Sequence, residues 1–163
     1  MMKTMLTDKD IAYLQQAVDL ALVGVKQGMG GPFGCIIVKD DRVIGKGYNQ
    51  VISDNDPTAH AEVVAIRDAC THLGSYQLTG CTLYTSCEPC PMCLGAIYWA
   101  RPERILYATT RFTAADAGFD DKFIYDEIAI PDNDRKIPFV FYHEEQFLKP
   151  FQYWKEQQDK RLY

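Results

Sequence analysis

The chain has 163 residues, which is the length of one ordinary domain. Its 17 Lys and Arg against 22 Asp and Glu give a net charge of −5, and 47% of its residues are hydrophobic. A polyanion binder draws its affinity from Lys and Arg that neutralise phosphates. An acidic chain without a basic block therefore disfavours nucleic acid and membrane surfaces as partners.

The N-terminal third predicts a helix followed by a β-hairpin. Thr7, with Asp10 three residues later, forms an N-cap pattern, and apolar residues then recur at helical spacing as far as Val25. A glycine-rich stretch at 28–32 ends this helix. Two apolar runs at 33–38 and 42–47, joined by an Asp-Asp turn, are typical of a hairpin.

The remaining elements are predicted in alternation. We expect a polar loop at 51–57, a helix at 58–73 that ends at Gly74, a strand at 82–85, a helix at 90–100 and a strand at 104–108. Weaker patterns predict a helix at 121–128, an extended run at 139–142 and a helix at 150–160. Helices that alternate with short strands predict a single α/β domain, 1–163, with a mixed sheet.

Six cysteines stand at positions 35, 70, 81, 87, 90 and 93. The first sixteen residues have no apolar run of signal-peptide type, and no stretch approaches the ~18 apolar residues of a membrane span. We therefore expect a cytoplasmic protein, in which clustered cysteines more often bind metal or act in catalysis than form disulfides. Cys35, Cys70 and Cys81 are expected to be small buried hydrophobic residues.

The strongest chemical pattern combines His60-Ala61-Glu62 with Pro89-Cys90-Pro91-Met92-Cys93. Imidazole and thiolate are common zinc ligands, and three protein ligands leave the fourth tetrahedral position open to water. Cys90 and Cys93 fall in a first helical turn, where the helix dipole favours thiolates. Glu62 could take a proton from the activated water and return it to a leaving group.

Other interpretations of the cysteines remain open at this point. An iron–sulfur motif would need a further cysteine where Ile97 stands. A closed structural zinc site could take its fourth ligand from Cys87, His72 or His143, and Cys90 with Cys93 could form a redox pair. The redox pair leaves His60 and Glu62 without a role.

These motifs are similar to those of the zinc nucleoside and nucleobase deaminases. Within that superfamily, the chain resembles the bacterial guanine deaminases of the cytidine-deaminase fold. The resemblance covers essentially the whole chain and lies in the segments Gly31-Pro32-Phe33-Gly34, Asn55 to Glu62, Thr85 to Cys93, Leu94 to Pro102, Ala117 to Asp121, Pro150-Phe151-Gln152 and Tyr163.

The resemblance implies a three-layer α/β/α fold, one Zn²⁺ per subunit and hydrolysis of guanine to xanthine and ammonia. It implies His60, Cys90 and Cys93 as zinc ligands and Glu62 as the proton shuttle. It also implies a homodimer in which a segment at about 137–163 is exchanged between subunits. The residues that it places at the substrate are Phe33, Asn49, Ala61, Trp99, Asp121 and Tyr163.

Three other functions compete with guanine deamination. A tRNA adenosine deaminase has the same zinc motif but should carry a basic rim, whereas Lys155, Lys160 and Arg161 are offset here by Glu156 and Asp159. The other two are a deaminase of another small base and a zinc-stabilised binding module without catalysis. A free purine base is the expected partner.

Overall fold

The computed structural model describes residues 6–162. The chain divides into two compact units, Met1–Asp121 and Lys122–Tyr163, so a single domain over the whole chain stays a prediction. In the first unit the elements are α1 (Asp8–Lys26), β1 (Gly34–Lys39), β2 (Arg42–Tyr48), α2 (Val51–Asp54), α3 (Ala61–Leu73), β3 (Thr82–Cys87), α4 (Pro91–Ala100), β4 (Arg104–Thr109) and α5 (Arg111–Asp116).

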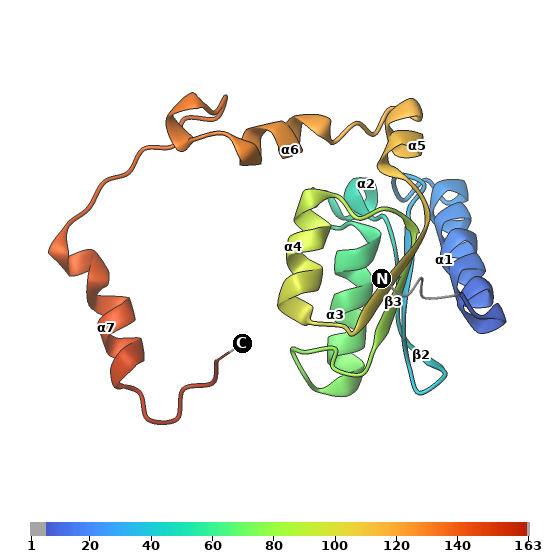
Figure 1. The fold of residues 1–163 in the computed structure, drawn as a ribbon, viewed down its shortest axis with the longest axis horizontal. Coiled ribbons are helices and arrows are strands. Elements are labelled where there is room, and N and C mark those ends of the chain that lie inside the picture. The colour runs from blue at the N-terminus through green and yellow to red at the C-terminus, as the bar shows by residue number, and fades with distance from the viewer. Residues whose placement is uncertain (1–5, 163) are drawn as a thin grey trace. The chain divides into compact units, whose positions relative to one another are not determined.

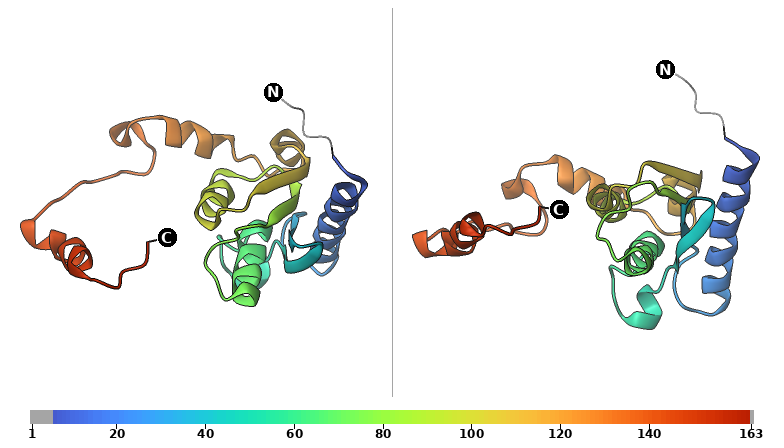
Figure 2. Two further views of the ribbon diagram at one scale, coloured as in Figure 1. Left: turned by 60° about the horizontal axis from the view of Figure 1, so that its bottom comes forward. Right: turned by 90° about the horizontal axis from the view of Figure 1, so that it is seen from below.

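The first unit has three layers built on a four-stranded sheet with the order β2-β1-β3-β4. Strand β1 pairs antiparallel with both β2 and β3, whereas β3 and β4 are parallel. Helix α1 covers one face of the sheet, and α3 and α4 cover the other (Figures 1 and 2). The expected mixed sheet and three-layer α/β/α fold are confirmed.

The alternation of side chains along β1 separates the two halves of the core. Ile37 points towards α3 and α4, where it joins a cluster that includes Ala65 and Leu83. Ile36 points to the opposite face, where it packs with Tyr84 and the residues of α1. Successive side chains of a strand face opposite sides of the sheet, so one strand supplies both cores.

Two glycines of β2 let α3 lie unusually close to the sheet. A Cβ added at Gly45 would lie 2.6 Å from the carbonyl oxygen of Ala65, and one at Gly47 would lie 2.4 Å from that of Ala61. No residue with a side chain fits at these distances. This close approach fixes the first turn of α3 against the sheet.

A buried ionic network fastens α1 to the sheet. Thr7 and Asp10 form the predicted capping box at the start of the helix. Asp10 also accepts a hydrogen bond of 2.8 Å from the hydroxyl of Tyr84 on β3 and two of 3.2 Å from Arg104 on β4. Burial opposes ionisation of Asp10, but the hydrogen bonds from Thr7, Tyr84 and Arg104 outweigh it and lower its pKa to about 2.

The structure differs from the sequence-based elements at several places. The expected loop at 51–57 contains the one-turn helix α2, and α3 begins at Ala61 rather than near Thr58, because His60 has extended dihedral angles and caps the helix. Helix α5 was not expected. Its six residues are too few to show an apolar period.

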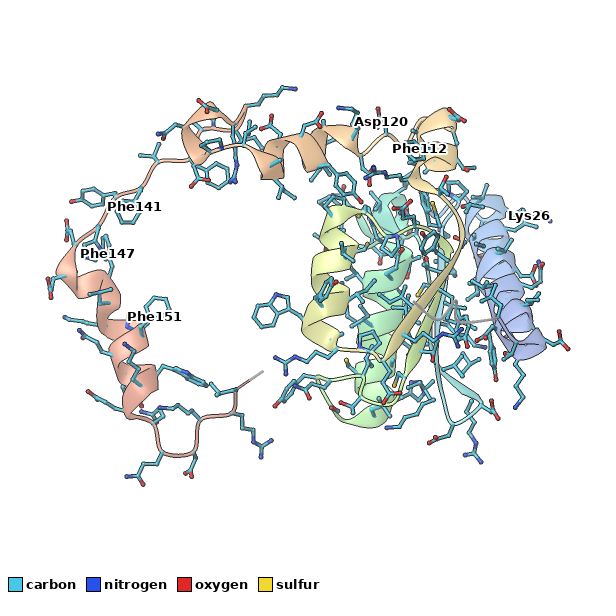
Figure 3. All side chains as sticks on the ribbon, in the orientation of Figure 1. Lys26, Phe112, Asp120, Phe141, Phe147 and Phe151 are labelled. Atoms are coloured by element: carbon cyan, nitrogen blue, oxygen red, sulfur yellow. The ribbon has the colours of Figure 1, made fainter. Side chains whose placement is uncertain are left out.

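The second unit contains α6 (Lys122–Ala129), two 3-10 helices, η1 (Asp132–Asp134) and η2 (Glu145–Leu148), and α7 (Lys149–Glu156). Residues 139–142 belong to no strand, and the last helix ends at Glu156 rather than at 160. None of residues 122–162 is buried, and aromatic side chains such as Phe141, Phe147 and Phe151 are exposed (Figure 3). Among residues 6–162, no helix is long and apolar enough to cross a membrane.

Candidate metal centre and active site

The first half of the site is the N-terminus of α3. The loop before it is shaped by Asp56, whose carboxylate accepts hydrogen bonds from the backbone and hydroxyl of Thr58. His60 is the N-cap of α3, and its imidazole therefore stands at the mouth of the helix. Ala61 and Glu62, in the first turn, are both buried.

The second half of the site is the N-terminus of α4, which follows directly after β3. Cys90 is the N-cap, and its sulfur accepts a hydrogen bond from the backbone N–H of Cys93. Pro91 occupies the first helical turn, where its missing N–H costs nothing. The two thiols thus lie on one face of this turn, as the spacing predicts.

His60, Cys90 and Cys93 meet at one point, with their ligand atoms all within 4.8 Å of one another. Nδ1 of His60 lies 3.5 Å from the Sγ atom of each cysteine. A tetrahedral zinc ion with Zn–S bonds of about 2.3 Å and a Zn–N bond of about 2.0–2.1 Å requires an N···S separation of about 3.5 Å. The three side chains therefore fit zinc in both chemistry and spacing.

The three groups of the cluster shift one another's pKa values. A hydrogen bond from Cys93 and then one from His60, working against burial, lower the pKa of Cys90 to about 4. The hydrogen bond to Cys90 and burial raise the pKa of Cys93, and the hydrogen bond with Cys90 raises that of His60. Thiol ligands bind a metal ion as thiolates, so metal binding to this cluster is coupled to the release of protons.

Glu62 lies beside the cluster without belonging to the ligand set. Its Oε1 atom accepts a hydrogen bond of 3.0 Å from the hydroxyl of Thr85, and its Oε2 atom is 3.3 Å from Sγ of Cys93. The carboxylate is almost fully buried, and burial raises its pKa in spite of these hydrogen bonds. A buried carboxylate with a raised pKa beside a metal site is suited to carrying a proton.

Phe33 immediately precedes β1 and Asn49 immediately follows β2, so the two residues lie at the same end of the antiparallel hairpin, where the backbone N–H of Asn49 donates to the carbonyl of Phe33 at 3.0 Å. Oδ1 of Asn49 accepts hydrogen bonds of 3.2 Å from the backbone N–H groups of Gly31 and Val51. Because this oxygen is occupied, the amide NH₂ is the group left for a ligand. The ring of Phe33 packs edge-on against Phe119, with the centroids 5.1 Å apart.

The other expected substrate residues are placed as follows. Asp121 is partly buried at the end of the first unit, and burial and then the negative charge of Cys90 raise its pKa. Trp99 is 63% exposed on α4. Tyr163 lies outside the described residues. The substrate roles of all three, and those of Phe33, Asn49 and Ala61, stay predictions.

The structure brings no fourth protein ligand to the cluster from residues 6–162. The thiol of Cys87 is directed at the carbonyl of Thr110, and His72 pairs with Asp68 in its own helix. An open three-ligand centre therefore suits the geometry better than a closed structural one.

The cysteines outside the zinc motif differ in burial. Cys35 and Cys81 are buried as expected, whereas Cys70 is partly exposed.

Two contributors to the site were missed by the sequence analysis. Thr85 was considered only as part of a strand and of a matching segment, and Phe119 only as part of a matching segment. The signal for Thr85 was a hydroxyl residue at a strand position that faces α3, between Leu83 and Cys87. Such a group needs a polar partner when it is buried.

The fold and the site together define a zinc-dependent deaminase. The family model of the cytidine and deoxycytidylate deaminase zinc-binding region matches residues 7–109, and the chain belongs to this family.

Individual relatives are similar over different lengths. Guanine deaminase of Bacillus subtilis is 58% identical over 93% of this chain and 97% of its own. The crystal structure of guanine deaminase from Bacillus subtilis superposes with a TM-score of 0.93 at 55% identity, over 97% of this chain and 99% of that one. A tRNA-specific adenosine deaminase of Buchnera aphidicola subsp. Schizaphis graminum is 38% identical over 65% of this chain and 70% of its own.

Proposed function

We propose that the chain is a zinc-dependent guanine deaminase that hydrolyses guanine to xanthine and ammonia. The observation that carries this proposal is the 58% identity to a guanine deaminase over nearly the full length of both chains. The open cluster of His60, Cys90 and Cys93 beside buried Glu62 supplies the required chemistry. We also propose one zinc ion per subunit, a role in purine catabolism and a cytoplasmic location.

The proton transfers fall to Glu62. Zinc held by His60, Cys90 and Cys93 would supply Lewis-acid activation of a water molecule. Glu62 takes one proton from the attacking water and passes it to N3 of guanine as a C2–O bond forms. It then carries the second proton from that oxygen to the amino nitrogen, so that the C2–N bond breaks, ammonia leaves and a C2 carbonyl remains. Water and guanine thus account for every atom of xanthine and ammonia.

Asn49 and Asp121 are proposed to read the edge of the base. The free NH₂ of Asn49 can donate to a ring nitrogen or carbonyl oxygen. Asp121 can accept from N1–H and the 2-amino group of guanine, and adenine has no N1–H to offer. A partly buried carboxylate without a donor costs about 1–3 kcal/mol, which disfavours the wrong base. Phe33, Ala61, Trp99 and Tyr163 complete the proposed pocket.

A tRNA substrate is not favoured. The tRNA-specific relative covers 65% of this chain, whereas the guanine deaminase covers 93%. The net charge of −5 also offers little attraction for an RNA backbone.

Ammonia release from purified, zinc-loaded protein tests the function. Guanine, adenine, cytosine and a tRNA anticodon stem-loop are supplied separately at equal concentration. We expect ammonia and xanthine from guanine only. Faster ammonia release from the stem-loop or from another base than from guanine would overturn the proposal. No ammonia from any of the four substrates would favour a non-catalytic binding module.

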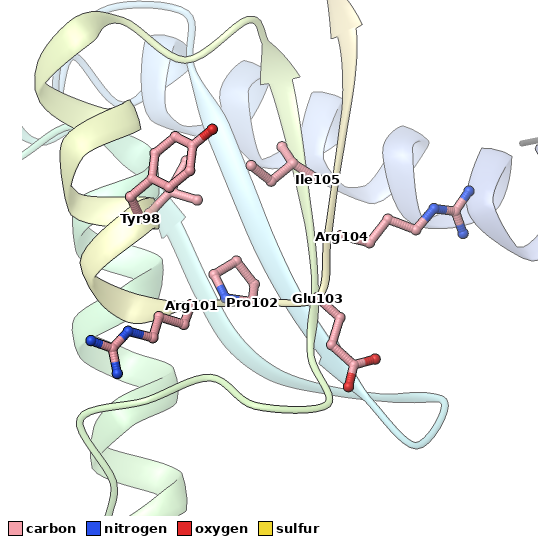
Figure 4. Close-up of a pocket in the computed structure, with 7 residues that line it drawn as sticks. Tyr98, Arg101, Pro102, Glu103, Arg104 and Ile105 are labelled. Atoms are coloured by element: carbon pink, nitrogen blue, oxygen red, sulfur yellow. The ribbon is translucent and has the colours of Figure 1, made fainter. Parts of the chain in front are cut away.

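We also propose that the active form is a homodimer in which the segment 137–163 packs against the partner subunit. Residues 122–162 carry many exposed aromatic side chains and no buried ones. Independently, α4 and β4 expose Leu94, Tyr98 and Tyr107, and Tyr98 lines a groove of about 340 Å³ between the end of α4 and the start of β4 (Figure 4). No member of the zinc cluster lines this groove. Apolar patches of this kind mark protein–protein contacts.

Subunit mixing tests the exchange. Glu62→Gln and Tyr163→Ala are each expected to be inactive alone. If Tyr163 acts in the partner's site, refolding the two together yields hybrids with one intact site and about a quarter of wild-type activity. A mixture that stays inactive, although light scattering shows dimers and mixed dimers are detected, would refute the exchange.

A further inference from the structure

The hydroxyl of Thr85 contacts the carboxylate of Glu62, and the proposed reaction gives this contact no role. Thr85 is fully buried on β3 and faces α3. Its Oγ1 atom lies 3.0 Å from Oε1 of Glu62 and 3.4 Å from the carbonyl oxygen of Gly34. A hydroxyl has one proton, and the shorter bond to a charged acceptor is the stronger of the two. The hydroxyl of Thr85 therefore donates its hydrogen bond to Glu62 rather than to the carbonyl of Gly34.

This bond makes the two carboxylate oxygens of Glu62 unequal. Oε1 is occupied by Thr85, whereas Oε2 faces the metal ligands and lies 3.3 Å from Sγ of Cys93. Oε2 is therefore the oxygen on the side of the candidate zinc ligands, where the proposed reaction takes place.

The position of Thr85 is itself rigid. It pairs with Cys35 in the antiparallel ladder between β1 and β3 and with Tyr107 in the parallel ladder to β4. A strand paired on both sides moves less than a loop, so the donor is fixed relative to both helix N-termini. A catalytic group held by a locked neighbour keeps its productive orientation.

We propose that Thr85 is a positioning residue that fixes the orientation of the Glu62 carboxylate. Oε1 accepts the hydrogen bond from Thr85, and Oε2 carries the protons. This inference rests on the proposed deaminase function. Removing the hydroxyl leaves the carboxylate free to turn, so it should lower kcat while KM and zinc content stay nearly unchanged.

The neighbouring residue on β3 provides a matched control. Tyr84 points to the opposite face, and its hydroxyl donates to Asp10 at 2.8 Å. Tyr84→Phe therefore also removes one buried hydroxyl from the same strand, away from Glu62. A purely structural role would make Thr85→Val and Tyr84→Phe behave alike.

The experiment compares Thr85→Val, Thr85→Ser, Thr85→Ala and Tyr84→Phe with the wild type. Zinc content, the thermal unfolding midpoint, and kcat and KM for guanine are measured. We expect Thr85→Val and Thr85→Ala to lose about 10- to 100-fold in kcat, with KM within about threefold. Thr85→Ser restores the hydroxyl and should stay within about threefold of the wild type. Tyr84→Phe should lower the unfolding midpoint and keep kcat.

The outcomes separate this inference from the proposed function. If the wild type has no activity on guanine, the proposed function is wrong. If the wild type is active and Thr85→Ser and Thr85→Ala have equal kcat, Thr85 does not position Glu62. The comparison of Thr85→Ser with Thr85→Ala remains possible even if Thr85→Val does not fold. Loss of zinc in Thr85→Ala also overturns the positioning role. A crystal structure of zinc-loaded Thr85→Ala is expected to show Glu62 in more than one orientation, and a single wild-type orientation would contradict the proposal.

Discussion

Gly47 offers a sharp test of how the sheet positions the active site. A Cβ added there would lie 2.4 Å from the carbonyl oxygen of Ala61 and 2.6 Å from the backbone nitrogen of Ala65, whereas ordinary contacts begin near 3.4 Å. Gly47→Ala therefore requires α3 to move away from β2 by about 1 Å. His60 and Glu62 lie at the N-terminus of α3 and must move with it.

Two magnitudes follow from this shift. Overpacking a core by one methyl group costs about 1–3 kcal/mol of stability. A displacement of about 1 Å at a catalytic group can cost about 100-fold in rate. We therefore expect Gly47→Ala to lower both the free energy of unfolding and kcat/KM for guanine, and to weaken zinc retention.

Gly95→Ala in α4 is the matched control. An added Cβ there has nothing within 4 Å, and alanine is favoured over glycine within a helix by about 0.5–1 kcal/mol. Urea unfolding, metal analysis and guanine kinetics are measured for both variants. If Gly47→Ala matches the wild type in stability and kcat/KM, the close packing of α3 on β2 does not position the site.

Three further predictions concern single side chains. Glu62→Gln should keep stoichiometric zinc and lose turnover by at least about 100-fold, since general acid–base catalysis contributes about 10²–10⁴-fold; near wild-type turnover would exclude Glu62 as the proton shuttle. Cys90→Ala should lose zinc during dialysis against a mild chelator, and stoichiometric metal in that variant would exclude Cys90 as a ligand. Asp10 has a pKa of about 2 in the folded protein, below the ordinary 3.8, so its stabilisation is present above about pH 4 and is lost as the pH falls towards 2. Asp10→Asn should therefore destabilise the protein at pH 7 by about 2 kcal/mol and flatten its stability between pH 4 and 2, and an unchanged acid limb in urea titrations would contradict this.

Local patterns in the sequence determined most of the elements of the first unit. The capping box of Thr7 and Asp10 and the Asp40-Asp41 turn are signals that act within a few residues, and both are present in the structure. The zinc motif was equally readable, because Cys90 and Cys93 are neighbours in one helical turn and His60 begins another helix. The extent of short or capped segments was harder to predict, since α2 and α5 are too short to show a period.

Only the tertiary structure decided which side chains meet. The 3.5 Å spacing of His60 from both cysteines depends on two helix N-termini brought together at one end of the sheet. Thr85 lies 23 residues from Glu62, and nothing local in the sequence pairs them. The closeness of α3 to β2 depends on glycines whose missing side chains matter only once a helix lies above them. The sequence thus indicated the candidate zinc ligands and their chemistry, because those signals are local, whereas packing between distant elements decided how the carboxylate of Glu62 is held.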